Sequence, residues 1–261
     1  MDSSVGIVVP AYRPDVERLV SYVDAVDEHL QPDALHIELD APRPAVLNRL
    51  AETPATVHTV YDRRGKGAAI TCGFEHLETD VLAFADGDGS TPPESLADVV
   101  EPVATGRADL GVGSRRHPQS VVGTHQTHGR RWLGDGFAWM ARRLLDAELY
   151  DYQCGAKAIS RDAWEAVRQH LYEPGFAWDI ELIAMAAALD RPIEEVPISW
   201  YDQPNSTVAP VGTTLALARG LFTSRHRAKL LRDSRLHSAI AMYRDEPSAL
   251  VDRTRPEKTD D

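Results

Sequence analysis

Short apolar runs alternate along the chain with longer segments in which apolar residues recur every three or four positions. The first run, VGIVV at residues 5–9, is closed by Pro10. The segment that follows, residues 15–30, repeats apolar residues at helical spacing: Val16, Leu19, Val20, Val23, Val26 and Leu30. A β-branched run followed by this spacing predicts a strand and then an amphipathic helix.

The same alternation continues through the first half of the chain and beyond. Further strands are predicted at ALHIEL (which ends at Asp40), ATVHTV, VLAFA, ADLGVGS, AKAIS and EEVPISW, and helices at residues 46–50, 66–77 and 92–104. Strands that alternate with helices form right-handed βαβ units, so the pattern predicts an α/β fold whose mostly parallel sheet has helices on both faces.

Composition and charge narrow the class of partner. The 261 residues carry a formal charge of -12, and a nucleic-acid partner is excluded as a general ligand because binding the phosphate backbone needs a basic surface. The two cysteines, Cys72 and Cys154, lie far apart without metal-ligand spacing and are interpreted as reduced core thiols. No apolar run approaches the roughly 20 residues needed to cross a bilayer.

Two carboxylates follow the apolar run VLAFA in the stretch ADGDGST. In an open parallel sheet ligands bind beyond the carboxyl ends of the strands, and Asp86 and Asp88 stand at such an end. Carboxylates flanked by glycines suit a hard divalent cation, Mg²⁺ or Mn²⁺, that is shared with substrate phosphates. The alternative is a solvated turn, because clusters of acids and glycines are common in turns.

Seven motifs in order resemble those of the family 2 glycosyltransferases, and more closely those of the polyprenyl-phosphate (dolichyl-phosphate) glucosyl- and mannosyltransferases. They are VGIVVPAYRP, RRGKGAAITCGF, VLAFADGDGST, ADLGVGSRR, YDYQCGAKAISRDAWEAV, GFAWDIELIAMA and IEEVPISWYDQPNSTV. The resemblance covers residues 5–210 and implies a single Rossmann-like, GT-A-type domain that transfers a sugar from a nucleoside diphosphate. QCGAK and EVPISW are more similar to the glucosyl branch.

The resemblance assigns the donor side. It implies that Pro10, Tyr12 and Asp40 surround the nucleotide base, that Lys66 adds positive charge near the base or diphosphate, and that Asp86 and Asp88 hold the metal. It also makes Gln153 a sugar or phosphate contact. Packing at a strand end remains the alternative for Tyr12, and solvent exposure for Lys66. Two segments, AYRP and ELDAPRP, depart from the family pattern, which leaves UDP or GDP open.

Arginines accumulate where the resemblance implies the acceptor phosphate. Arg115 follows a strand end, and Arg130 and Arg131 lie near the start of a helix, so the three guanidinium groups are expected to converge on a phosphate with no compensating acid nearby. The alternative is a solvated basic face. The family often has a serine one turn after the Arg130 position, where this chain has Gly134.

Asp179 and Glu181 stand at the front of a predicted helix. In relatives that glycosylate a hydroxyl, an acid in this neighbourhood is the general base, whereas an ionised phosphate needs none. The two acids are therefore catalytic candidates that act as a base or position groups around the acceptor and sugar. The alternative is that they complement the helix macrodipole.

The expected reaction is an inverting transfer of a hexose from a nucleoside-diphosphate sugar to a polyprenyl (dolichyl) phosphate, for protein or surface glycosylation. Two alternatives stay open: a glycosyltransferase that acts on a saccharide or protein hydroxyl, and a degenerate member that binds a nucleotide without catalysis. Sugar nucleotidyltransfer is disfavoured because its glycine-rich, arginine-bearing N-terminal loop is absent.

Three regions are expected along the chain: a catalytic domain at residues 1–210, a basic amphipathic helical segment at 211–244 and a disordered tail at 245–261. Between residues 219 and 235 six cations face one acid, Asp233. Such a helix fits binding to a membrane surface, which predicts a peripheral protein on the cytoplasmic face of the cell membrane. The alternative is that this segment packs its apolar face on the catalytic domain.

Overall fold

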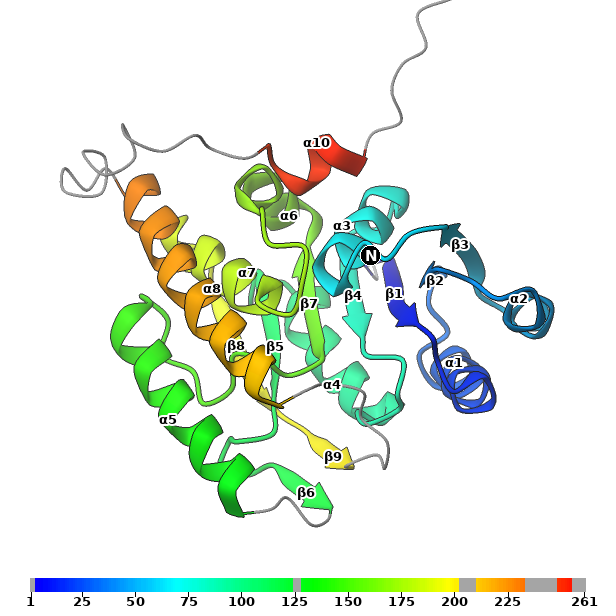
Figure 1. The fold of residues 1–261 in the computed structure, drawn as a ribbon, viewed down its shortest axis with the longest axis horizontal. Helices are drawn as coiled ribbons and strands as arrows, with labels where there is room; N and C mark the ends of the chain where they lie inside the picture. The colour runs from blue at the N-terminus through cyan, green and yellow to red at the C-terminus, as the bar shows by residue number, and fades with distance from the viewer. Residues whose placement is uncertain (1–2, 124–127, 202–209, 233–247, 255–261) are drawn as a thin grey trace, which may run out of the picture.

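The structure is a computed structural model, and it describes residues 3–123, 128–201, 210–232 and 248–254. Within these ranges the side chains of residues 128–135, 210–215 and 254 are not described. The chain folds around one seven-stranded sheet with helices on both faces (Figure 1). This is the α/β fold that the alternation of strands and helices predicts.

The sheet has the strand order β3-β2-β1-β4-β7-β5-β8. Its strands are β1 (Val5–Tyr12), β2 (Ala34–Asp40), β3 (Thr56–Val60), β4 (Val81–Ala85), β5 (Leu110–Ser114), β7 (Ala156–Ser160) and β8 (Ile193–Pro197). All neighbouring pairs are parallel except the two that involve β7, which runs antiparallel between β4 and β5. β7 thus enters the middle of the sheet from the opposite end and places Lys157 opposite Phe84.

Two apolar layers cover the sheet. One layer contains side chains of α1, α2 and α4, and the other contains side chains of α3, α5, α6, α7, α8 and α10. The helices are α1 (Val16–Leu30), α2 (Pro44–Leu50), α3 (Lys66–His76), α4 (Pro93–Ala104), α5 (His128–Leu144), α6 (Arg161–Val167), α7 (Trp178–Ala188), α8 (Pro210–Leu231) and α10 (Leu250–Thr254), with a 3₁₀ turn η1 (Arg168–His170) after α6.

The predicted strand EEVPISW is divided in two. β8 ends at Pro197, and after Ile198 the chain leaves the main sheet as β9 (Ser199–Tyr201), which pairs with β6 (Val121–Gly123). Because Pro197 lacks a backbone N–H, it is a natural place for the ladder of the main sheet to end. The small β6–β9 sheet lies beyond the ends of β5 and β8 (Figure 1).

The basic segment after residue 210 packs on the catalytic body. α8 runs alongside α7 and α5 (Figure 1). Three cations of α8 and one that directly follows it contact the body: Arg225 contacts the carbonyl oxygen of Leu144, Arg227 the carboxylate of Glu181, Lys229 that of Asp146, and Arg232, just after the helix, those of Asp146 and Asp190. These cations stabilise helix packing, so they are not simply directed at a membrane.

The predicted tail contains a packed turn. Leu250–Thr254 form α10, in which Leu250 and Val251 are buried, and the Leu250 amide donates to the carbonyl of Leu171. Residues 233–247 and 255–261, where the rest of the predicted amphipathic segment and tail falls, lie outside the described residues. Within the described ranges, no helix combines the length and the apolar composition that spanning a bilayer requires.

Candidate active site

The ends of three neighbouring strands bring the predicted donor residues together. Tyr12 ends β1, Asp40 ends the adjacent β2, and Asp86 directly follows β4 on the other side of β1. Two arginines lie over the Tyr12 ring, with Cζ of Arg63 at 4.4 Å and Cζ of Arg13 at 5.2 Å from its centroid. The carboxyl edge of the sheet therefore carries an aromatic ring, two acids and two arginines.

Asp40 organises the loop that leads into α3. Its Oδ2 accepts hydrogen bonds from the amides of Arg64 and Gly65 at 2.7 and 3.1 Å, and its Oδ1 accepts one from Nε of Arg64 at 2.7 Å. Gly65 has a φ of 99°, and a Cβ there would approach the carbonyl oxygen of Pro174 to 2.5 Å. The predicted base-reading acid thus also fixes the conformation of the RRGKG loop.

Lys66 connects two acids across the site. Its ammonium lies 2.9 Å from Oδ1 of Asp86 and 3.0 Å from Oδ2 of Asp179. Burial alone would lower the pKa of Lys66, but the charges of Asp179 and Asp86 outweigh it and raise the pKa, so the ammonium stays protonated. Lys66 is therefore placed beside the metal-binding candidate, with both contacts made to carboxylates.

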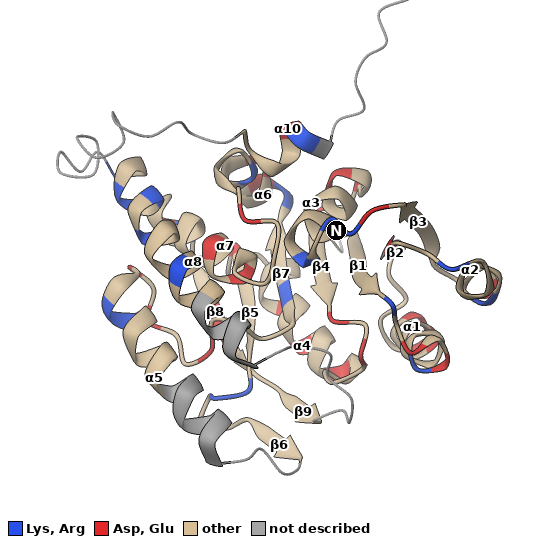
Figure 2. Cartoon of the chain, in the orientation of Figure 1, with Lys and Arg blue, Asp and Glu red and all other residues tan. Residues whose placement is uncertain are grey.

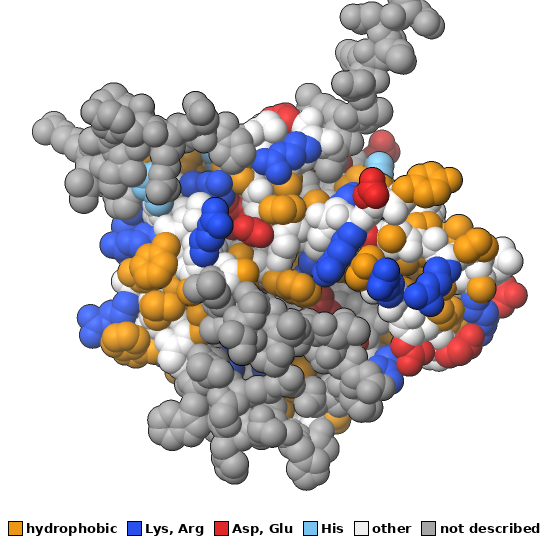
Figure 3. Space-filling model, viewed as in Figure 1, with side chains coloured by type: hydrophobic (Ala, Val, Ile, Leu, Met, Phe, Trp, Pro, Cys, Tyr) orange, Lys and Arg blue, Asp and Glu red, His pale blue; other side chains and the backbone are white. Residues whose placement is uncertain are grey.

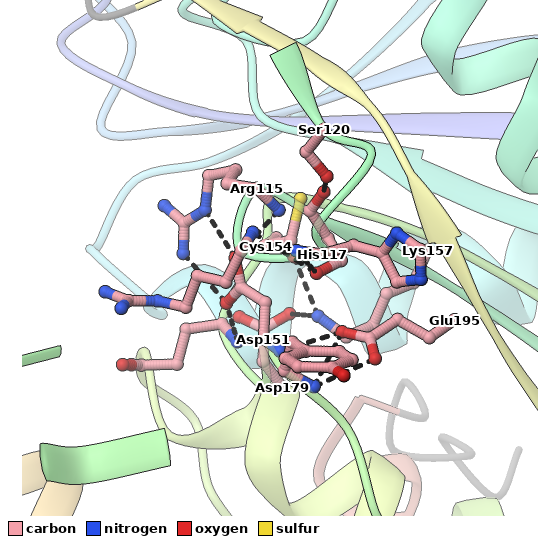
Figure 4. A network of polar contacts seen from close by, with 12 residues as sticks. Arg115, His117, Ser120, Asp151, Cys154, Lys157, Asp179 and Glu195 are labelled. Atoms are coloured by element: carbon pink, nitrogen blue, oxygen red, sulfur yellow. Dashed lines mark hydrogen bonds and ion pairs between the residues drawn. The ribbon is translucent and has the colours of Figure 1, made fainter. Parts of the chain in front are cut away.

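A second lysine holds the other oxygen of Asp179. Nζ of Lys157, from β7, lies 2.8 Å from Oδ1 of Asp179 and donates to the Cys154 carbonyl at 2.7 Å (Figure 4). Burial would raise the pKa of Asp179, but Lys157 and Lys66 outweigh it and lower the pKa. Asp179 is consequently an ionised, doubly paired carboxylate and a weak base.

The acid pair at the end of β4 fits a divalent cation. Asp88 is exposed, and its Oδ1 accepts the Ser90 amide at 2.9 Å, while the Asp86 side chain is 41% exposed. Partial loss of solvation beside the surrounding protein, together with repulsion from Asp88 and Asp179, raises the pKa of Asp86, although Lys66 opposes the shift. A cation at Asp88 would relieve this concentration of negative charge, and oxygen ligands suit Mg²⁺ or Mn²⁺. Figure 2 shows the acidic segment at the end of β4.

Gly155 leaves the space that Asp86 occupies. The Gly155 carbonyl accepts the Asp86 amide at 2.8 Å, and a Cβ on Gly155 would overlap the Asp86 carboxylate. Gly155, the residue just before the antiparallel strand β7, therefore determines where Asp86 of the acid pair can lie. This requirement explains the glycine in the QCGAK motif.

Arg115 has an acid partner, and the expectation of an uncompensated guanidinium there was wrong. Its Nε and Nη2 donate to the two oxygens of Asp151 at 2.7 and 3.0 Å (Figure 4). Asp151 was not predicted as the partner because it lies 36 residues from Arg115, in the loop before β7. Burial would raise the pKa of Asp151, but Arg115 outweighs it and lowers the pKa. Nη1 of Arg115 takes no part in the two hydrogen bonds to Asp151.

The turn that carries Asp151 is anchored from β8. Glu195 accepts the amides of Tyr150 and Asp151 at 2.8 Å, and Asp151 in turn accepts the Gln153 amide at 3.0 Å. Gln153 is thereby placed next to the Arg115–Asp151 pair. Arg130 and Arg131 fall within α5, but their side chains lie outside the described residues.

Glu181 is fully buried away from the sheet edge. It accepts the amides of Tyr172 and Glu173 at 2.8 Å and pairs with Arg227 of α8. Burial raises the pKa of Glu181 although Arg227 and the two amides oppose the shift. These contacts hold α7 against α8 and against the loop before α7. Glu181 therefore has a structural role.

Several residues around the site were missed by sequence reasoning. Lys157, Gly155 and Asp151 come from one stretch, DYQCGAK, in which only Gln153 was predicted as a site residue. One signal was available: the chain has four lysines against many arginines, and two of the four, Lys66 and Lys157, meet at Asp179. Cys72 and Cys154 are free thiols, as expected.

Comparisons with known proteins agree with this architecture. The family described as Glycosyl transferase family 2 matches residues 44–168. The glycosyltransferase AglD of Haloferax volcanii is 30% identical over 82% of this chain and 35% of its own length. The dolichyl-phosphate beta-glucosyltransferase of Saccharomyces cerevisiae is 30% identical over 62% of this chain and 52% of its own length. This chain thus spans a third to about half of these two relatives.

A bacterial relative and a solved structure extend the comparison. The undecaprenyl-phosphate mannosyltransferase of Micrococcus luteus is 33% identical over 59% of this chain and 65% of its own length. The glucosyl-3-phosphoglycerate synthase of Mycobacterium tuberculosis, solved with Mn²⁺, UDP and phosphoglyceric acid, aligns with a TM-score of 0.64 at 19% identity over 87% of this chain and 78% of that one. At this identity the likeness concerns the fold, which is the expected GT-A type.

Proposed function

This chain belongs to the family 2 glycosyltransferases, and we propose that it transfers a hexose, glucose or mannose, from a nucleoside-diphosphate sugar to a polyprenyl (dolichyl) phosphate. The sugar-transferring domain in this proposal is residues 1–210. Its relatives include enzymes named for dolichyl phosphate and for undecaprenyl phosphate, which supports this class of acceptor.

One observation carries the choice of a phosphate over a hydroxyl. A hydroxyl acceptor needs a general base with a free, accessible lone pair. Asp179 has one lysine on each oxygen, and Glu181 is buried against Arg227 and two backbone amides. Neither acid is arranged to take a proton from an acceptor. A phosphate is already ionised at neutral pH, so the site as built is adequate for it.

The proposed step is a single displacement with inversion at the anomeric carbon. An oxygen of the acceptor phosphate forms a bond to that carbon while the bond from the carbon to the diphosphate oxygen breaks and its electron pair leaves with the diphosphate. A Mg²⁺ or Mn²⁺ ion, when bound, would neutralise the charge of the departing diphosphate. Asp88 would hold that ion, with Asp86 kept in place by Lys66 and by the space at Gly155.

The acceptor side of the proposal rests on Arg115. Asp151 fixes the guanidinium by two hydrogen bonds, so Arg115 is preorganised to donate from Nη1 to a phosphate oxygen. The ring of Trp200 lies 5.6 Å from Cζ of the same guanidinium. Arg130 and Arg131 remain candidates for the same phosphate.

The acceptor is a lipid, and we propose that α5 and α8 meet the membrane surface. Trp139 on α5 and Phe222 on α8 are 63% and 55% exposed, and Arg143 lies over the Trp139 ring. Figure 3 shows hydrophobic and basic side chains gathered on the side of the molecule that carries these helices. Aromatic rings beside arginines favour the interface of a bilayer, which in this proposal is the cytoplasmic one.

Two acceptors that differ in one group test the proposal. The purified chain is incubated with UDP- or GDP-hexoses, Mg²⁺ or Mn²⁺, and either a polyprenyl phosphate or the matching polyprenol. We expect a glycosylated lipid, detected by mass, with the phosphate only. Equal transfer to the polyprenol or to a saccharide hydroxyl would favour the alternative acceptor class. Nucleotide binding without turnover of any donor would favour a non-catalytic member.

A further inference from the structure

A cluster of metal-ligating side chains lies on the α3 face of the sheet, outside the site described above. Glu38 of β2 is fully buried, and its Oε1 lies 3.4 Å from Nδ1 of His76 at the end of α3. Cys72 stands one turn before His76 on the same face of α3. One donor atom from each of Glu38, Cys72 and His76 falls within a group whose members are all within 4.8 Å of one another.

Two more histidines border this cluster. His58 pairs with Glu38 in the ladder between β3 and β2, and its Nδ1 lies 2.8 Å from Glu38 Oε1. The His58 ring centroid is 4.4 Å from that of His76 and 4.8 Å from that of His36. His36 Nδ1 is buried and makes no hydrogen bond within the described part of the chain. Three of the ten histidines in the sequence thus gather around one carboxylate.

We propose that Glu38, Cys72 and His76 bind a thiophilic divalent metal ion of the Zn²⁺ class, separate from the cation at Asp88. A thiolate, an imidazole and a carboxylate are the ligand set that Zn²⁺ takes in proteins, whereas Mg²⁺ prefers oxygen ligands. Bond lengths of about 2.0 to 2.3 Å place tetrahedral ligand atoms roughly 3.3 to 3.8 Å apart, so the 3.4 Å between Glu38 and His76 already fits.

The surroundings supply the other features of a metal site. His58 donates to the carboxylate oxygen that would ligate, which is how neighbouring groups orient metal ligands. His76 is about half exposed, so an ion can enter from solvent and keep a water as its fourth ligand.

Arg64 connects this cluster to the donor loop. Its Nη1 lies 2.9 Å from Glu38 Oε2, while its Nε lies 2.7 Å from Asp40 Oδ1. The Arg64 amide also donates to Asp40. An ion held by Glu38 would therefore restrain the carboxylate that positions Arg64. Through Arg64 it would also restrain the loop that leads to Lys66.

A Co²⁺ titration tests the site without any assay of sugar transfer. Co²⁺ replaces Zn²⁺ in such sites, and a thiolate ligand adds a charge-transfer band in the near ultraviolet. The metal-stripped full chain is titrated as wild type, as Cys72→Ser and as two controls, Cys154→Ser and Asp88→Asn. We expect the wild type and both controls to bind one equivalent of Co²⁺ in a site that shows the thiolate band. Cys72→Ser should show no such band.

Two further variants separate ligation from folding. His76→Ala changes a half-exposed residue at a helix end and leaves the fold intact by circular dichroism, yet it should weaken Zn²⁺ binding in calorimetry by more than tenfold. His58→Ala should weaken Zn²⁺ binding by about 10- to 100-fold, as loss of an orienting group does. A wild type without the thiolate band, a band that persists in Cys72→Ser, or an unchanged affinity in His76→Ala would each overturn the proposal.

Discussion

Asp179 and Lys157 form an ion pair of 2.8 Å in which both side chains are almost completely buried. Asp179 comes from the first turn of α7 and Lys157 from β7, the antiparallel strand between β4 and β5. The pair joins the helical layer to the sheet directly beneath the acid pair, because the second oxygen of Asp179 binds Lys66 and Lys66 binds Asp86. Its integrity is therefore needed for both stability and geometry.

Asp179→Asn should destabilise the fold by about 3–5 kcal/mol, because the buried ammonium of Lys157 loses its carboxylate partner, while Lys66 keeps Asp86. Urea unfolding monitored by circular dichroism measures the change. Glu17→Gln, which affects an exposed pair with Arg49, is the matched control and should change stability little. A loss for Asp179→Asn no larger than that of the control would contradict the structural role of the pair.

The same pair predicts a dependence of stability on pH. Since the folded-state pKa of Asp179 is lowered, its contribution is present above the unfolded aspartate pKa of about 3.9 and is lost as pH falls through the folded value. Stability of the wild type should therefore drop more steeply below pH 4 than that of Asp179→Asn. Parallel curves from pH 7 to pH 3 in urea unfolding would argue against the lowered pKa.

Gly155→Ala should reduce sugar transfer by about 100-fold or more, the effect expected when a group at the site is displaced by about an ångström. The new methyl would overlap the Asp86 carboxylate. Gly136→Ala is the control, because Gly136 lies in α5 with open space around it. The control should keep full activity and gain about 0.8–1 kcal/mol of stability. Full activity in Gly155→Ala would refute the packing argument.

Asp88→Asn should lower the rate of transfer by about 100- to 1000-fold, the range seen when one preorganised electrostatic contact is removed. EDTA should stop the wild-type reaction, and added Mg²⁺ or Mn²⁺ should restore it. Asp98→Asn removes a comparable exposed acid from α4 and should have no effect. Transfer that is indifferent to EDTA would remove the metal from the mechanism.

Arg115→Ala should raise the Michaelis constant for polyprenyl phosphate more than that for the sugar nucleotide. The loss of one charge-assisted contact of about 1.5–3 kcal/mol corresponds to roughly 10- to 150-fold. Because the single variant leaves Asp151 unpaired, the double variant Arg115→Ala/Asp151→Asn serves as the control for folding. If the double variant binds the lipid phosphate normally, Arg115 does not contact the acceptor.

Trp139→Ala/Phe222→Ala should reduce flotation of the protein with anionic liposomes that contain polyprenyl phosphate. Both rings are exposed on the α5–α8 side, and their removal takes apolar area away from the interface. Tyr61→Ala, which removes a 95% exposed ring outside α5 and α8, should float like the wild type. Equal loss in the two variants would mean that exposed aromatics act without regard to position.

The sequence by itself determined the elements and the edge at which they converge. Runs of β-branched residues and helical spacing depend on neighbours a few residues apart, so β1, β2 and β4 were predictable, and parallel pairing then placed their ends together. β1 continues past its predicted end at Pro10 and ends at Tyr12. The sequence also placed the acid pair Asp86 and Asp88 at this edge, and the family resemblance supported its interpretation as a metal site. These features are local, or follow from one rule of sheet topology.

Only the tertiary structure decided how the charges pair. Lys66 and Asp179 are 113 residues apart, and Arg115 and Asp151 are 36 apart, and no local pattern relates either pair. The Arg115–Asp151 contact follows from the antiparallel entry of β7 between β4 and β5, and the Lys66–Asp179 contact from the packing of α3 against α7. An alternating pattern of strands and helices reveals neither. Because the energy of a buried charge depends on which opposite charge lies within about 4 Å, its partner and its pKa were fixed only when the distant strands came together.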